Sequence, residues 1–436
     1  MTSDKGAAGG RAGGSAAALR LVGAVDAAGV PVEVRCDNGR ITSVRRGAPA
    51  GPVVERTAGG QVTTVELSGM TLLPALAEPH AHIDKAYTAD RYVNATGDLD
   101  GAIAASHRCF AERTAADIAA DARRALGAYL AKGCLSVRTH VAIGPVMGLR
   151  SMEGVRSAVA DYAGLVDVQV VAHVAPPVHG RAGRANLALL REAIAMGATQ
   201  VGGTPYRDDD PVAETAALVE AAAAAEVPLD LHTDETLDPG CLTVVELARV
   251  VQARRFPFAV TASHCVSLGV QDEADQRRVA GLLAEAGVAV VSLPQTNLYL
   301  QGRGTPRATP RGLTALGALR AAGCRVAAGG DNVQDPFNPM GRADPLEAAS
   351  LLVTAGHLDT AAAFALVSEG AREVMGLEPV ALVEGSPADL VAVPGAGLRE
   401  VVAEGDARRV VVRRGEVVRP SRAAHPTARA REVAHV

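Results

Sequence analysis

The stretch Leu72–Tyr87, which reads L-L-P-A-L-A-E-P-H-A-H-I-D-K-A-Y, decides the fold of this chain. It opens with a short apolar run, and Pro74 and Pro79 exclude a helix through it, so we expect a buried strand. His80 and His82 stand at the end of this strand. Because residues i and i+2 of an extended strand project to the same side, the two imidazoles can bind one divalent transition metal.

The composition is that of an ordinary globular protein of one large domain or two smaller ones, with 48% hydrophobic and 21% charged residues in 436. The formal net charge of -5 is small for this size, which argues against nucleic acid or an anionic membrane as a partner. No apolar run reaches the roughly 18 residues of a membrane span. The six cysteines show no C-x-x-C or framework spacing, so we expect reduced thiols and a cytoplasmic protein.

The two ends of the chain have the pattern of β structure. Residues 17–71 and 376–420 contain short alternating apolar segments with turn signals such as Asp37-Asn38-Gly39. Each part is too small to be stable alone, so we expect one discontinuous β-sandwich domain formed by both chain ends. Residues 1–16, rich in Gly and Ala, are expected to be a flexible leader without the apolar region of a signal peptide, and residues 421–436 a loose tail.

Residues 72–375 alternate short apolar strands with amphipathic helices. The expected strands are Leu72–Ala77, Leu135–Val141, Val168–Val174, Gln200–Gly203, Leu229–His232, Ala259–Ser263, Ala289–Leu293 and Arg325–Ala328. The clearest expected helices start at Thr114 and span Ala185–Ala195, Pro211–Ala225, Asp272–Ala286 and Asp344–Ala355. Eight such units over about 300 residues predict a (β/α)8 TIM barrel. A doubly wound open sheet is the alternative, but no Gly-rich phosphate turn follows the first strand.

Polar residues stand where four of these strands end. They are His80 and His82 after the first strand, His232 and then Glu235 after the fifth, His264 after the sixth, and Asp331 after the eighth. Catalytic groups of a barrel enzyme gather at the carboxyl ends of its strands. We therefore expect these side chains to form one site, rather than to serve separate structural roles.

The order of these residues resembles the amidohydrolase superfamily, and more closely its cytosine deaminase branch, over nearly the whole chain. The motifs that carry the resemblance are P-H-A-H-I-D-K, V-R-T-H-V at Val137–Val141, H-T-D-E at His232–Glu235, A-S-H at Ala262–His264, L-Q-G-R at Leu300–Arg303 and G-D-N-V-Q-D-P-F-N-P-M-G at Gly330–Gly341. The resemblance implies hydrolytic deamination of a ring amidine by a hydroxide on one bound divalent metal.

The resemblance also implies a role for each residue. The metal ligands would be His80, His82, His232 and Asp331. His264 would hydrogen-bond the metal-bound hydroxide and the developing tetrahedral oxygen. Glu235 would carry a proton from the water to a ring nitrogen and on to the leaving amine, with Asp331 assisting the deprotonation.

The chemistry agrees with these roles, because a metal lowers the pKa of a bound water to about 7 and a nearby carboxyl can then protonate the leaving group. The fourth strand ends in Gly203-Thr204-Pro205, where bimetallic relatives carry a bridging lysine. We therefore expect a single divalent ion per chain, and iron, zinc and manganese all suit nitrogen and oxygen ligands.

The end of the third strand departs from the cytosine deaminases, which carry a Pro-Gln-Glu-Gly element whose glutamine reads the pyrimidine. Here Val171–Gly180 reads V-A-H-V-A-P-P-V-H-G and contains no glutamine. We therefore expect cytosine to be a poor substrate, and a ring with another polar edge or a bulkier exocyclic group to be preferred. The candidate substrate contacts are His173, His179, Gln301, Asn332 and Phe337.

Several other polar residues have two readings from the sequence. His140 either contacts the site or is structural; Asp84 and Lys85 either orient His82 or cap the turn. Asp335 could support the loop of Asp331. The run Asp208–Asp210 is expected to be a solvated loop and helix start, and His107, His357, His425 and His435 are expected at the surface.

Three functions remain open from the sequence. The first is a deaminase of a small cytosine-like heterocycle, or of a related cyclic amidine or triazine ring. The second is a cyclic amide hydrolase with the same metal, from which ammonia release would distinguish it. The third is a metal-binding barrel without activity, against which the carboxyl of Glu235 argues because a structural metal site does not need it. Whether the chain forms a homo-oligomer is open.

Overall fold

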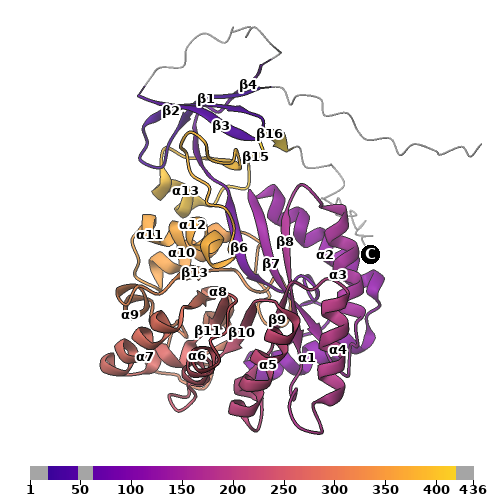
Figure 1. Cartoon of the computed structure of the whole chain (residues 1–436). Coiled ribbons are helices and arrows are strands. Elements are labelled where there is room, and N and C mark those ends of the chain that lie inside the picture. The colour runs from indigo at the N-terminus through magenta and orange to yellow at the C-terminus, as the bar shows by residue number, and fades with distance from the viewer. Residues whose placement is uncertain (1–17, 48–61, 419–436) are drawn as a thin grey trace, which may run out of the picture.

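The computed structural model describes residues 18–47 and 62–418, so the expected leader and tail, with His425 and His435, lie outside the described residues. The chain forms a barrel of parallel strands surrounded by helices, and a mixed sheet at one end of it (Figure 1). The predicted fold class is confirmed.

The barrel sheet holds eight parallel strands in sequence order, with each strand next to the one that follows it in the chain. These are β6 (Leu76–Ala81), β7 (Cys134–Ile143), β8 (Asp167–Val174), β9 (Gln200–Gly202), β10 (Leu229–Thr233), β11 (Val260–His264), β12 (Val288–Ser292) and β13 (Val326–Ala328). Valine and alanine dominate their buried positions, as expected for strands covered on both faces.

The first and last strands meet at a seam. The backbone N–H of Asp331 donates to the His80 carbonyl at 3.1 Å, and the N–H of His82 donates to the Asp331 carbonyl at 3.1 Å. Ala81 and Asp331 form a parallel bridge. The seam therefore closes the barrel at the residues that the sequence analysis singled out.

The helices of the barrel layer follow the strands in order. They are α1 (Leu99–Glu112), α2 (Ala115–Ala131), α3 (Arg150–Asp161), α4 (Arg184–Ala195), α5 (Pro211–Ala225), α6 (Thr243–Arg254), α7 (Glu273–Ala286), α8 (Pro294–Leu300), α9 (Leu316–Ala321), α10 (Pro345–Thr354), α11 (Thr360–Leu366) and α12 (Glu369–Val374), with short 3-10 turns η1 (Pro205–Arg207) and η2 (Val266–Val270). The start expected at Thr114 is a capping box with Asp117, in which each side chain accepts the backbone N–H of the other residue.

The prediction of the first strand as Leu72–Ala77 was wrong in one respect. That run belongs to two strands in two sheets: β5 (Met70–Pro74) pairs with β14 (Leu390–Pro394) in the mixed sheet, and β6 begins at Leu76. Ala75, between them, donates its backbone N–H to the carbonyl of Asp389. Both strands are buried, so an unbroken apolar run does not reveal the change of sheet.

The mixed sheet combines strands from both ends of the described chain. Besides β5 and β14 it contains β1 (Leu19–Val25), β2 (Pro31–Asp37), β3 (Arg40–Arg46), β4 (Thr63–Glu66), β15 (Val410–Arg413) and β16 (Glu416–Val418), with helix α13 (Leu398–Glu404) after β14. Asn38 and Gly39 have φ of 49° and 77° and make the two-residue turn between β2 and β3 that the sequence indicated. A separate apolar core, which includes Leu21, Val34 and Leu390, lies within this sheet.

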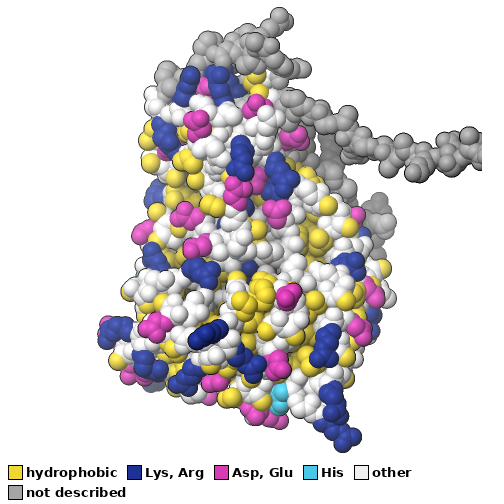
Figure 2. Space-filling model, viewed as in Figure 1, with side chains coloured by type: hydrophobic (Ala, Val, Ile, Leu, Met, Phe, Trp, Pro, Cys, Tyr) yellow, Lys and Arg dark blue, Asp and Glu magenta, His cyan; other side chains and the backbone are white. Residues whose placement is uncertain are grey.

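Among the described residues, no helix combines the length and apolar character needed to cross a membrane. Figure 2 shows acidic and basic side chains interspersed over the visible face, rather than gathered into a field of one sign.

Candidate active site

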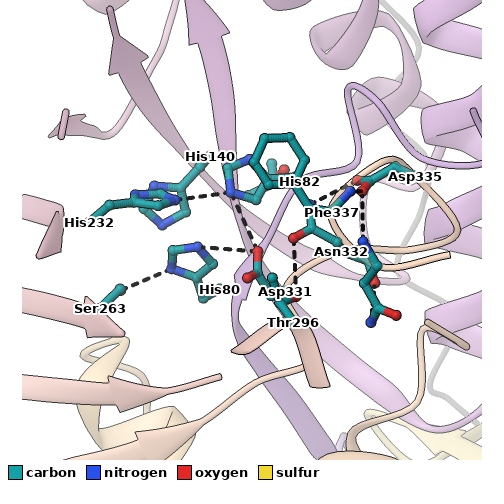
Figure 3. Close-up of polar contacts among 12 residues, drawn as sticks. His80, His82, His140, His232, Ser263, Thr296, Asp331, Asn332, Asp335 and Phe337 are labelled. Carbon is teal, nitrogen blue, oxygen red and sulfur yellow. Dashed lines mark hydrogen bonds and ion pairs between the residues drawn. The ribbon is translucent and has the colours of Figure 1, made fainter. Parts of the chain in front are cut away.

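The carboxyl ends of the barrel strands bring the predicted metal ligands together (Figure 3). The Nε2 atom of His82 lies 3.1 Å from Nε2 of His232 and 3.5 Å from Oδ1 of Asp331. Nε2 of His80 lies 3.6 Å from the same Asp331 oxygen. His80 and Asp331 are at most 1% exposed, so this contact is made away from solvent.

These atoms fit a divalent cation. Two nitrogen or oxygen ligands, each about 2.0–2.1 Å from one ion, lie roughly 3–3.5 Å apart, close to the spacings observed. Nε2 of His80, Nε2 of His264 and Oδ1 of Asp331 are buried and have no hydrogen-bond partner among the described residues. Buried polar atoms are almost always satisfied, so their shared lack of partners points to a cation. The candidate ligand groups are His80, His140 and His232, and His80, His264 and Asp331.

A buried chain of hydrogen bonds fixes His80. Its Nδ1 atom lies 2.9 Å from the Ser263 hydroxyl, which donates to Oδ1 of Asp230 at 3.1 Å. The other oxygen of Asp230 accepts from Nη1 of Arg138 at 2.7 Å. Since the Ser263 proton goes to Asp230, Nδ1 of His80 donates to Ser263, which leaves the lone pair of Nε2 free for a metal.

Two more histidines belong to this cluster. The ring of His140 stacks on that of His80 with centroids 3.9 Å apart, and the ring of His173 lies 4.4 Å from that of His232. Burial lowers the pKa values of these residues below the usual value, so the imidazoles are neutral, the form that binds metals. The lowered pKa values are those of His80, His82, His140, His173, His232 and His264.

Glu235 places a carboxyl beside this cluster. It is 4% exposed, its Oε2 accepts from the Tyr206 hydroxyl at 3.2 Å, and its Oε1 has no hydrogen-bond partner in the described part of the chain. Burial raises the pKa of Glu235 to about 7, against the lowering effect of the Tyr206 hydrogen bond. A carboxyl with this pKa can both accept and release a proton near neutral pH.

His264 and Asp331 leave their strands with unusual backbone angles. Their φ values are 70° and 61°, a region that residues other than glycine rarely adopt. Nδ1 of His264 donates to Oδ1 of Asn297 at 3.0 Å, so Nε2 of the neutral ring can accept a hydrogen bond from water. Burial raises the pKa of Asp331 to about 7.

A cavity of about 340 Å³ lies over this cluster and has two unlike walls. The polar wall contains His82, Lys85, His173, His232, Glu235, His264, Asp331 and Asn332. The other wall is largely apolar and comes in part from helix α1, the end of β7 and the loop after it, through Leu99, Ile103, Phe110, Ile143 and Met147. The arrangement suits a planar ligand with one polar edge at the histidines and an apolar face.

A sequence model of the amidohydrolase family matches residues 88–419, which is more than half of the chain. The chain belongs to the amidohydrolase family. Pterin deaminase from Rhizobium rhizogenes (strain K84) is 33% identical over 376 residues, which cover 83% of this chain and 84% of that protein. The family and its predicted deaminase-like branch are confirmed.

Solved structures agree with this assignment. 5-methylcytosine deaminase from Klebsiella pneumoniae, liganded with 5-fluorocytosine, has a TM-score of 0.80 and 26% identity, over 96% of this chain and 98% of that chain. N-isopropylammelide isopropylaminohydrolase from Burkholderia multivorans has a TM-score of 0.77 and 29% identity, over 92% and 98%. This amidohydrolase is therefore an enzyme that hydrolyses carbon–nitrogen bonds, as predicted.

The predicted substrate contacts fall into two sets. His173, Asn332 and Phe337 line the cavity of this amidohydrolase, whereas His179 and Gln301 are not among its lining residues. Nε2 of His179 instead lies 2.9 Å from Oδ1 of Asp208. Gln301 donates from Nε2 to the backbone carbonyl of Glu235 at 3.1 Å.

The structure shows the contacts of the residues whose roles the sequence left open. Asp335 accepts from the Phe337 backbone N–H and from the Asn332 side chain, both at 2.8 Å, so it does support the loop after Asp331. Asp84 accepts from the N–H of Ala142 at 2.9 Å. Lys85 lines the cavity, with Nζ 4.7 Å from the centroid of the Phe337 ring.

Sequence reasoning missed Arg138, Asp230, Ser263 and Asn297, which hold the histidines rather than contact a ligand. A signal for the first two was present. Arg138 and Asp230 are opposite charges in the middle of apolar strands, and such charges are buried only when paired. Asn297 carries no comparable signal, because it lies in a short helix whose position relative to His264 depends on the whole barrel.

Proposed function

We propose that this amidohydrolase removes an exocyclic amino group from a planar heterocycle by hydrolysis, using one divalent ion of iron, zinc or manganese. The ion would be held by His80, His82, His232 and Asp331, with His140 at its edge. The observation that carries the proposal is the position of Glu235. Glu235 lines the same cavity as the ligand cluster, its Oε1 has no hydrogen-bond partner among the described residues and lies 3.6 Å from Nδ1 of His264, and burial raises its pKa to about 7.

A bound ion at this point would acidify water by several pKa units and so supply the nucleophile at neutral pH. The chain's own residues handle protons and orientation. His264, with Nδ1 engaged by Asn297, accepts a hydrogen bond from water at Nε2 and orients it. Glu235, held by Tyr206, accepts one proton of the water at Oε1 and gives it to a ring nitrogen. It then carries the second proton of the water to the amine, which leaves as ammonia.

The walls of the cavity favour a fused ring over a single pyrimidine. The apolar side chains of α1 offer a surface to a second ring, beyond the one that reacts at the metal. Asn332 can read a ring carbonyl or N–H, since an amide carries both a donor and an acceptor. The relative at 33% identity is a pterin deaminase, and pterin is a fused aminopyrimidine ring. We therefore propose a pterin-type substrate and expect cytosine to be poor.

The test is an ammonia-release assay on the metal-loaded protein. The panel contains pterins with different ring substituents, cytosine, 5-methylcytosine and N-alkylated aminotriazines, with product masses recorded. Ammonia and a product heavier by 1 Da, as expected when NH is replaced by O, would support deamination of a pterin. Ring opening without ammonia would establish the cyclic amide hydrolase instead. No turnover of any compound by fully metal-loaded protein would refute the enzyme proposal.

We also propose that the protein works in a reducing compartment such as the cytoplasm. All six cysteines lie in the described residues, and each is a free thiol. Burial raises the pKa of the Cys36 thiol to about 11 and of the Cys241 thiol to about 12, which makes both unreactive near neutral pH.

A further inference from the structure

A second group of metal-ligating side chains lies beside the active-site cavity, outside its lining residues. It consists of His179 in the loop after β8, Asp208 after η1, and Glu214 in the first turn of α5. One ligand atom from each of the three lies within 4.8 Å of the other two. Asp208 and Glu214 are close in the sequence, and the fold brings His179 from the preceding strand–helix loop to them.

Glu214 is a buried carboxyl group with one oxygen that no hydrogen bond satisfies among the described residues. It is 0% exposed, and its Oε2 accepts from the backbone N–H of Val178 at 2.7 Å. Its Oε1 is buried and has no partner among the described residues. A buried carboxylate oxygen without a partner is costly, so such an atom calls for a proton or a cation.

The neighbours of Glu214 favour a cation. Nε2 of His179 lies 2.9 Å from Oδ1 of Asp208, and a carboxylate oxygen of Asp208 lies within 4.8 Å of one of Glu214, so a second carboxyl is close to the first. The side chain of Asp208 is 6% exposed and that of His179 is 29% exposed, which leaves a route from solvent. The run Asp208–Asp210 was expected to be a solvated loop and helix start, and Asp209 and Asp210 are exposed, with Asp210 capping α5; the side chain of Asp208 is the part that is shielded. One imidazole and two carboxylates are a ligand set typical of zinc or manganese.

We propose that His179, Asp208 and Glu214 bind a second divalent transition-metal ion, separate from the ion of the active site. Its role is structural. His179 lies three residues after Pro176, and Asp208 lies two residues after Tyr206. Pro176 and Tyr206 both line the substrate cavity. An ion here would tie the two loops together and so fix that wall of the cavity, including the Tyr206 hydroxyl that holds Glu235.

The test is metal stoichiometry after removal of all metal with a chelator and reloading with Zn²⁺, measured by mass spectrometry of the metal. We expect two ions per chain in the natural protein and about one in Glu214→Gln. Asp209→Asn is the matched control, because Asp209 is an exposed neighbour outside the cluster, and it should keep both ions. His232→Ala should lose the active-site ion and keep the second, which separates the two sites.

Glu214→Gln was chosen because its amide oxygen can still accept from Val178, so the variant should fold. As a second readout, Zn²⁺ should slow amide hydrogen exchange in residues 176–183 and 204–214 of the natural protein but not of this variant. One ion per chain in the natural protein, or two in Glu214→Gln, would overturn the proposal and show that Glu214 is simply protonated. Neither result bears on deamination, because no step of this test measures activity.

Discussion

Replacing Glu235 by Gln separates proton transfer from every other property of the active site. The amide keeps the size of the side chain and can still accept a hydrogen bond from the Tyr206 hydroxyl, which lies 3.2 Å from Oε2 of Glu235 in the natural protein. It cannot take up and release a proton. General acid–base catalysis contributes about 10²–10⁴-fold in rate. We therefore expect kcat to fall by about 10² or more, which is at least about 2.7 kcal/mol in the barrier.

The same change should stabilise the metal-free protein at alkaline pH. Burial raises the pKa of Glu235 from 4.5 to about 7, so the folded state binds this proton more tightly than the unfolded state. Stability then falls as pH rises from about 4.5 through about 7, and the full cost of the buried charge, about 3 kcal/mol, remains above that range. Gln carries no charge and avoids this cost.

Three measurements test the reasoning: metal content, kcat on the best substrate, and denaturant unfolding of chelated protein at pH 5 and pH 8. Metal content should stay near that of the natural protein. The variant should gain stability at pH 8 and little at pH 5. Turnover close to that of the natural protein would refute the proton-shuttle role. A loss of stability at pH 8 would show that Glu235 is ionised and favourably paired, contrary to the burial argument.

Tyr206→Phe provides a companion to this experiment. The Tyr206 hydroxyl lowers the pKa of Glu235 by hydrogen-bonding its charged form. Without the hydroxyl, that pKa should rise, and the acidic limb of the pH–rate profile should move to higher pH because Glu235 must begin as a base. If the acidic limb of the pH–rate profile does not move in Tyr206→Phe, it reports the titration of a group other than Glu235.

The remaining predictions concern the metal and the ring. His232→Ala should lose most of the active-site metal, measured as ions per chain, and full occupancy would remove His232 from the ligands. Ser263→Ala removes the acceptor of the His80 Nδ1 proton and should weaken metal affinity by about 10–100-fold in a chelator competition. Pro176→Gln puts an amide on the cavity wall and should raise cytosine turnover relative to a pterin. Efficient cytosine deamination by the unchanged protein would contradict the last prediction.

Much of the site could be predicted because the barrel imposes a simple rule. Residues that end parallel strands share one rim, so His80, His232, His264 and Asp331 could be grouped without knowing any distance between them. His80 and His82 could be paired from the sequence as well, because residues i and i+2 of one strand project to the same side. Glu235 lies two residues after the end of β10, and the chain there has little freedom to leave the rim.

The other features depend on long-range packing. Nothing near His179 in the sequence shows that its ring faces Asp208 rather than the cavity. The apolar wall comes from Leu99, Ile103 and Phe110, which read as an ordinary core face of a helix. The boundary at Ala75 was missed because β5 and β6 are both buried, and burial rather than pairing determines which residues are apolar.

The position of the metal ligands at the seam of the barrel suggests that the ion would also stabilise the closure of the barrel. His80 lies in β6, and His82 directly follows it. Asp331 follows β13, and its backbone exchanges hydrogen bonds with His80 and His82. An ion bound by all three would act as a clasp between the two ends of a closed ring of strands. Losing the ion would loosen the join itself, so hydrogen exchange on removal of metal should rise first in β6 and in the short β13. A substitution that weakens metal binding would then lower the activity and also destabilise the contact between the first and last strands.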